Sequence, residues 1–225
     1  MAWRLAAVTA VTTVLSAPLF ADERRIVGGR DFCVPPENLV KADPSIERAT
    51  RHLPETGFAF LISTSELRTD RPVVAQKNIN AQEMPITGTV EPLSDGRAID
   101  SYPRDHYWYR MARSPQAIVE ADAAQRHLVV FENAKREFWV IWRIPKGAPV
   151  TTASVDDKAS VVASCRRTDF RNLKGRQVDE TVSCHRNIRA GDFRISYDFD
   201  PLNLRAVDKL DAAVSNKVLG WLCRA

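Results

Sequence analysis

The sequence predicts an α+β protein built mainly from an antiparallel β-sheet, with a long C-terminal amphipathic helix packed on one face and disulfide staples. Three observations support this prediction: strand-length apolar or alternating segments follow one another in the second half, one helical periodicity closes the chain, and there are four cysteines. Strands followed by a helix, instead of strands alternating with helices, are typical of α+β domains. The 225 residues, 44% hydrophobic and 27% charged, can form one well-cored domain and exclude a wholly disordered, collagen-like or polytopic membrane protein.

Residues 1–21 have the pattern of a secretory signal peptide. Arg4 supplies a positive charge, an uncharged stretch of sixteen residues follows, and the small residue Ala21 precedes a charged segment. A transmembrane anchor is the alternative. Sixteen helical residues at about 1.5 Å each fall short of a hydrocarbon core of about 30 Å, and Pro18 interrupts them. We therefore expect cleavage after Ala21, a single domain at residues 22–225, no remaining transmembrane span, and a periplasmic or secreted protein.

Export changes how the cysteines are interpreted. Disulfides persist in oxidising compartments, so the even number of cysteines favours two disulfides. Four cysteines permit three pairings; we favour Cys165 with Cys184, on neighbouring strands, and Cys33 with Cys223, which would join the two ends of the domain. A zinc site is the competing interpretation, but the sequence has no Cys-x-x-Cys pair and no nearby histidine pair.

The first predicted strand and the predicted hairpin are strongly apolar. Residues 57–64 are apolar enough for a strand buried on both faces. Residues 126–131 and 137–144 flank a polar segment that suits a hairpin loop. Because residues 138–142 are continuously apolar and aromatic, we expect this strand at the centre of the sheet with both faces covered.

Three further strands are predicted in the second half of the chain. Segments 160–166 and 178–186 carry the Cys165 and Cys184 pair near their ends, and the alternation of aromatic and polar residues over 193–199 predicts a half-exposed strand. Between the first strand and the hairpin, proline-rich sequence limits the expectation to short extended pieces near residues 73–74 and 86–90.

Two helices are expected. A short one lies within residues 111–124, with Ser114 as N-cap and a proline in the first turn. The long one begins at Asp200, since aspartate is a favourable N-cap and the following proline is tolerated in a first turn. Apolar residues then recur every three or four positions to about residue 222. Cys223 in the last turn would tie this helix to the N-terminal segment.

Motifs for catalysis and for cofactors are missing from the sequence. Residues 25–29 read Arg-Ile-Val-Gly-Gly, which resembles the activation site of trypsin-like serine proteases, but no Gly-Asp-Ser-Gly-Gly nucleophile segment follows, and acyl transfer needs that hydroxyl. No Gly-x-Ser-x-Gly elbow, His-Glu-x-x-His helix or phosphate-binding glycine loop occurs, and the four histidines are dispersed. We therefore expect no metal and no cofactor, and we lean towards a protein that is not an enzyme.

The first candidate binding surface is the aromatic segment 102–110. Tyrosine, tryptophan and arginine anchor many interfaces because they bring a large contact area and a polar tip at modest entropic cost. We take Tyr107, Trp108 and Arg110 as candidate binding residues; a sugar stacked on these rings is another possibility. The alternative is an irregular strand or loop whose aromatic side chains cover the core.

The second candidate surface is a basic loop. Residues 160–194 contain eight Lys and Arg against four Asp and Glu, a net charge of +4. The connection between Arg167 and residue 177, closed at its base by the expected Cys165–Cys184 disulfide, would form a stiff basic lobe. Its candidate binding residues are Arg167, Arg171, Lys174 and Arg176. An acidic protein or an anionic envelope component would complement this charge. The alternative is an ordinary solvated face, and export argues against nucleic acid as the partner.

Together these features predict an exported non-catalytic binding protein, inhibitor-like or interacting with the cell envelope, that acts through the basic disulfide-based loop and the aromatic segment. The alternative function is an envelope hydrolase acting on glycan or peptide without a recognisable motif. A glycosidase would be indicated by a pocket beside Trp108 with two carboxylates about 5 to 10 Å apart.

Overall fold

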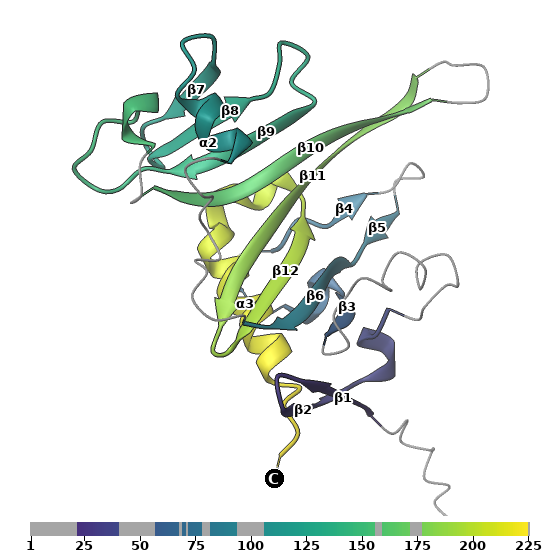
Figure 1. Cartoon of the computed structure of the whole chain (residues 1–225). Coiled ribbons are helices and arrows are strands. Elements are labelled where there is room, and N and C mark those ends of the chain that lie inside the picture. Colours follow the sequence, from purple (N-terminus) through teal and green to yellow (C-terminus); the bar gives the residue numbers. More distant parts are fainter. Residues whose placement is uncertain are drawn as a thin grey trace, which may run out of the picture.

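The computed structural model describes residues 22–40, 57–67, 69–70, 72–77, 82–93, 106–155, 159–171 and 177–224 (Figure 1). For residues 169–171 and 177–180 only the backbone is described. The predicted signal peptide at residues 1–21 lies outside these ranges, as do Lys174 and Arg176 of the predicted basic loop.

An eight-stranded antiparallel sheet dominates the structure, with strand order β3-β6-β12-β11-β10-β9-β8-β7. Its strands are β3 (Phe58–Ile62), β6 (Ile86–Pro92), β7 (Ile118–Asp122), β8 (His127–Phe131), β9 (Phe138–Arg143), β10 (Ser160–Arg171), β11 (Gln177–Ala190) and β12 (Phe193–Phe199). Two small hairpins are β1 (Glu23–Val27) with β2 (Arg30–Val34), and β4 (Gln76–Lys77) with β5 (Glu83–Met84).

The helices are α2 (Tyr107–Ala112), α3 (Val207–Leu219) and the 3-10 helices η1 (Pro36–Asn38), η2 (Thr64–Glu66), η3 (Thr152–Ser154) and η4 (Pro201–Ala206). Within the described ranges, no helix has the length and apolar character needed to cross a membrane. The predicted combination of a mainly antiparallel sheet, a C-terminal helix and two disulfides is therefore confirmed.

Strand β9 separates two hydrophobic clusters. Val140 and Trp142 belong to a cluster that includes Tyr109 of α2, whereas Ile141, between them in sequence, belongs to the larger cluster that includes Val214 of α3. Successive side chains on a strand point to opposite faces, so β9 is covered on both faces, as its continuous apolar sequence predicted. It lies third from one end of the sheet instead of at the centre, because two strands follow on one side and five on the other, where β12, β6 and β3 extend the sheet beyond β10 and β11.

Strand β3 differs from the prediction of burial on both faces. It is an end strand of the sheet: Phe58, Phe60 and Ile62 are buried, and Ala59 and Leu61 are only half-buried. The segment after η1 covers part of its outer edge, because Val40 donates its N–H to the carbonyl of Ala59. Apolar composition alone does not distinguish such a covered end strand from a central one.

The predicted helix within residues 111–124 is wrong. Helix α2 ends at Ala112, and its N-cap is His106, whose Nδ1 accepts from the N–H of Trp108 at 3.3 Å. Ser114 lies in the turn after α2, and residues 118–122 form β7. Pairing with β8 satisfies the backbone of β7 on one side, and this tertiary contact outweighs the local helix-start signal.

The C-terminal helix is shorter than predicted. Asp200 caps the segment as expected, accepting from the N–H of Leu202 at 2.8 Å, but the first turns form the 3-10 helix η4. Buried Asn203 accepts from the N–H of Val74 and donates to the Val74 carbonyl, at 2.9 and 2.8 Å. The α-helix begins only at Val207, where its buried side chains join the larger cluster.

Both disulfides are present with the connectivity favoured from the sequence. Cys165 and Cys184 are opposite each other in the β10–β11 register and are buried. Cys33 of β2 is bonded to Cys223, 190 residues later. Cys223 follows α3 instead of lying in its last turn, because the chain after the helix pairs with β2 through its Leu222. No cysteine is free.

A buried polar network joins α3 to the sheet. Arg186 of β11 donates from Nε and a terminal nitrogen to both carboxylate oxygens of Asp211, at 2.7 and 2.5 Å, and also to the carbonyl of Val162. Tyr197 of β12 donates its hydroxyl to Asp211 at 2.5 Å. Burial and the Asp211 carboxylate raise the pKa of Tyr197, so this phenol stays a hydrogen-bond donor at all ordinary pH values. The network therefore fixes α3 against β11 and β12, and Arg186 extends it to β10.

Candidate functional site

A two-stranded arm projects from the sheet at β10 and β11, as Figure 1 shows. Strand β10 pairs with β9 only as far as Arg166, and β11 pairs with β12 only from Cys184 onward. Between these limits, β10 and β11 pair only with each other. We call residues 167–183 the β10–β11 arm. Its outer backbone edges face no neighbouring strand of the described sheet.

The arm is fastened at its base. The Cys165–Cys184 disulfide lies inside the sheet, two register steps from Arg167 and Val182, the first pair of the arm. An isolated two-stranded ribbon is only marginally stable in water. The buried disulfide and the pairing of both strands within the sheet therefore supply a rigid root for a structure that would not persist alone.

The predicted basic lobe is distributed differently from expectation. Strand β11 has 14 residues, about 45 Å in length at about 3.3 Å per residue. Arg186 is engaged in the buried network, and Arg189 and Arg194 flank the turn at the end of β11 opposite the arm. The net charge of +4 counted over residues 160–194 is therefore spread along the whole length of β11 and is not concentrated in one lobe.

The candidate residues of the arm have different environments. Arg167 is half-buried at its base, where its backbone N–H donates to the carbonyl of Glu137 at 2.8 Å. Arg171 is the last residue of β10. Arg166, which the sequence argument did not select, is exposed, with its guanidinium 5.2 Å from the centre of the Phe138 ring. Lys174 and Arg176 lie outside the described residues.

The aromatic segment is helical at residues 107–110, not an irregular strand or loop. Tyr107 is 48% exposed, Arg110 is exposed, and Trp108 is half-buried with its ring 5.5 Å from that of Tyr107. Tyr109 is buried, edge-on against Trp142 at 6.0 Å. Both interpretations of the sequence apply to this segment. Tyr109 covers the core, whereas Tyr107 and Arg110 are exposed and can contact a partner.

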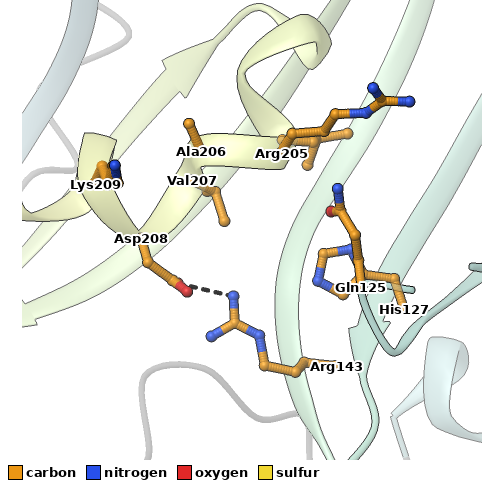
Figure 2. Close-up of a pocket in the computed structure, with 9 residues that line it drawn as sticks. Gln125, His127, Arg143, Arg205, Ala206, Val207, Asp208 and Lys209 are labelled. Atoms are coloured by element: carbon orange, nitrogen blue, oxygen red, sulfur yellow. Dashed lines mark hydrogen bonds and ion pairs between the residues drawn. The ribbon is translucent and has the colours of Figure 1, made fainter. Parts of the chain in front are cut away.

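A pocket that the sequence argument missed lies between the β8–β9 pair and the beginning of α3 (Figure 2). Its volume is about 570 Å³. It is lined by Gln125, His127, Arg143, Leu204, Arg205, Ala206, Val207, Asp208 and Lys209. These residues come from the end of the β7–β8 turn, from β8, β9, η4 and α3, so only the tertiary structure brings them together.

Positive charge dominates the pocket lining. Arg143 forms an ion pair with Asp208 at 2.8 Å, and Lys209 forms one with Asp70 outside the lining. Arg205 is exposed and has no ion pair or side-chain hydrogen bond among the described residues. The pocket therefore has one carboxylate, already paired, and an arginine available to a ligand.

His127 forms part of the pocket wall and is 7% exposed. Burial, followed by the positive charge of Arg143, lowers the pKa of its imidazole, and Asp122 and Asp208 oppose this shift. Its ring forms no hydrogen bond with the described residues. A neutral imidazole keeps one donor and one acceptor nitrogen, so His127 offers an unused donor to the pocket.

The lowered pKa of His127 leads to an expected pH dependence of stability. In the unfolded chain a histidine binds a proton near pH 6.5, whereas folded His127 does so only at lower pH. The unfolded state therefore binds more protons in this interval, and the free energy of unfolding should fall as the pH drops from about 7 to about 5. Denaturant unfolding across this range should give a shallower pH slope for His127→Gln than for the wild type; equal slopes would contradict the assignment to His127.

A second pocket, of about 520 Å³, lies at the joined ends of the chain and includes Cys33, Cys223 and the ion pair between Arg24 and Asp31. Each of the two pockets has one carboxylate, and each carboxylate is paired with an arginine. Trp108 lines neither of them. They do not supply the two carboxylates beside Trp108 that would favour the glycosidase alternative.

Within the described part of the chain, no three His, Cys, Asp or Glu side chains are grouped so as to hold a metal ion. The four cysteines, which a zinc site would have used, are all engaged in disulfides.

No protein-family model matches this sequence, and a search of curated proteins finds no similar one. Among solved structures, the chain is similar to an immunity protein of the Stenotrophomonas maltophilia type IV secretion system. The two share 11% sequence identity with a TM-score of 0.48, over 91% of this chain and 94% of the other. With so few identical residues, this similarity assigns no role to any residue of this chain.

Proposed function

We propose that this chain is an exported, non-catalytic binding protein that holds a protein partner through the β10–β11 arm. The projection of this arm beyond the sheet, with a disulfide at its root, is the observation on which the proposal depends. A segment that is rigid before binding loses little conformational entropy when a partner engages it. An arm of this kind suits an inhibitor-like protein or an envelope-interaction protein.

The arm offers a partner two kinds of contact. At its base, the N–H of Arg167 donates to Glu137 and the carbonyl of Val182 accepts from Gln76. Further out, the arm pairs with no other strand of the described sheet, so its edges can accept an added strand, a recurring mode of peptide recognition. The sequence from the last residue of β10 to the first residue of β11 carries Arg171, Lys174 and Arg176, which favour an acidic protein surface or another anionic component of the envelope. Tyr107 and Arg110 of α2 form the second proposed contact. The ring of Trp108 packs edge-to-face against that of Tyr107 and stabilises its position.

The disulfides support export to the periplasm or the medium. All four cysteines are paired, and disulfides of this kind persist in oxidising compartments and are rare in the cytosol. The proposed route is the signal peptide at residues 1–21, cleaved after Ala21, which leaves a single domain at residues 22–225.

Charge reversal in the arm tests the proposal. The variant combines Arg171→Glu, Lys174→Glu and Arg176→Glu, three basic residues between the Cys165 and Cys184 positions of the sequence. We expect it to fold with both disulfides and to lose at least tenfold in affinity for the partner. Charges at the rim of an interface raise the association rate, and three glutamates in place of basic residues would repel an acidic partner. The measurement is pulldown from an envelope extract with the oxidised protein, followed by titration of the captured partner.

A matched control carries the same change in charge elsewhere. It combines Lys135→Glu, Lys146→Glu and Arg189→Glu, three exposed residues outside the arm. The control should keep the affinity of the wild type. Equal losses from the two variants would show a general charge effect, and an unchanged partner profile for the arm variant would refute the role of the arm.

A further inference from the structure

The pocket between β8, β9 and α3 contains a feature that the fold itself does not explain. His127 is more than nine-tenths buried, yet its imidazole forms no hydrogen bond with any described residue and lines the pocket instead. Its ring nitrogens are not among the fully buried polar atoms that lack a partner, so they open onto the pocket space. A group that enters the pocket can therefore accept a hydrogen bond from His127 in the place of solvent.

The charges around His127 indicate the kind of group. Arg143, Arg205 and Lys209 are the cationic residues of the lining; Lys209 is paired with Asp70 and Arg143 with Asp208, so Arg205 carries the positive charge that no carboxylate balances (Figure 2). Arg205 has no partner among the described side chains, whereas Arg143 is held in place by Asp208. The helix α3 continues directly from η4, and the N–H of Val207 donates to the carbonyl of Leu204, so the charge of the lining comes from its side chains and not from a free helix end.

The volume and the apolar lining indicate the size of the ligand. About 570 Å³ lies within the range of sites for small organic molecules and is much more than a bare inorganic ion fills. Leu204 and Val207 contribute apolar side chains to the same wall. An organic body can therefore pack beside the group that carries the charge.

We propose that this pocket binds a small organic oxyanion, carrying one carboxylate or phosphate group, with that group held by His127, Arg143 and Arg205. Neutral His127 donates its ring N–H to one oxygen. The exposed guanidinium of Arg205, which points away from His127 and Arg143 in Figure 2, turns in over the group when it binds. Arg143 attracts it from the opposite side while remaining paired with Asp208. The Gln125 amide, beside His127 in Figure 2, is a further donor. This site is separate from the β10–β11 arm and does not depend on its function.

Histidine NMR provides a direct test. The oxidised protein is titrated with butyrate, benzoate and phenyl phosphate, and each is compared with its uncharged counterpart, butyramide, benzamide or phenol, at constant ionic strength. At least one of the anions should shift the ring resonances of His127 saturably, with a dissociation constant in the millimolar range or tighter. The neutral counterparts should leave them unchanged. The resonance is assigned by its loss in His127→Gln, and the two carboxylates and the phosphate ester distinguish the sources of the oxyanion.

Arg205→Gln supplies the matched test of the residues, because Arg205 is exposed and its removal leaves the core intact. This variant should bind the active anion at least tenfold more weakly. Arg189→Gln, an exposed arginine at the far end of β11, should bind it as the wild type does. An equal loss in the two variants, or no saturable shift of His127 with any of the three anions, would overturn the site. Neither result bears on partner capture by the arm.

Discussion

Replacing Cys33 and Cys223 together by alanine is expected to lower the free energy of unfolding by about 5 kcal/mol, the largest loss from removal of either disulfide. This bond closes a loop of 190 residues, and in the chain-entropy model the stabilisation grows with the logarithm of loop length. The local backbone contacts at this site are few: Cys33 donates its N–H to Trp221, and Cys223 donates to Asp31. Chemical denaturation of the oxidised variant and wild type measures the difference.

The second disulfide provides the comparison. Replacing Cys165 and Cys184 by alanine opens a loop of only 19 residues and should cost about 3 kcal/mol. If the variant lacking Cys165 and Cys184 is the less stable of the two, loop closure is not the source of the difference, and the packing of the buried sulfurs dominates instead.

Asp211→Ala is expected to cost about 3–5 kcal/mol of unfolding free energy. The substitution leaves the guanidinium of Arg186, 9% exposed, without its carboxylate partner, and an unpaired buried charge is strongly destabilising. It also removes the acceptor of the Tyr197 hydroxyl. The measurement is again denaturant unfolding, with near-ultraviolet circular dichroism to follow the aromatic packing around Tyr197.

Asp208→Ala is the matched control, three residues earlier on the same helix. Asp208 also forms an ion pair with an arginine, but its side chain is 69% exposed, so its removal should cost less than about 1 kcal/mol. If the two substitutions lower the free energy of unfolding by similar amounts, burial of the Arg186–Asp211 pair is not the reason for its larger expected contribution. Replacing the whole network, with Arg186→Met, Asp211→Leu and Tyr197→Phe, should cost less than Asp211→Ala alone because no charge is left buried.

The sequence patterns succeeded where the local signal and the tertiary environment agree. Alternation over Phe193–Phe199 matches the burial of every second side chain in β12. The aromatic run of β9 matches coverage by two clusters. The prediction of a helix within residues 111–124 failed because the Ser114–Pro115 pair is a general turn signal. Only the pairing of β7 with β8 decides that a strand follows it.

The candidate sites show the same division. The sequence identifies Arg167 and Arg171 as basic residues. It also counts Arg186 and Arg189 with them, although the length of β11 places these two far from the arm, so the four do not form one basic surface. The pocket had no sequence signal: His127 is one of four dispersed histidines, and Arg205 is 78 residues further along the chain. Residues so distant in sequence form no motif of fixed spacing, so the sequence alone cannot show that they line one pocket.

The sequence by itself determined the mainly antiparallel sheet and the expectation of two disulfides, with a preference among three pairings, because periodicity, turn chemistry and cysteine number act locally or through composition. The tertiary structure decided that two strands extend into an arm, that Arg186 is buried beside Asp211, and that His127 faces a basic pocket. These features depend on which segments meet in space and on how many neighbours each strand has. Such long-range contacts leave no regular pattern along the chain.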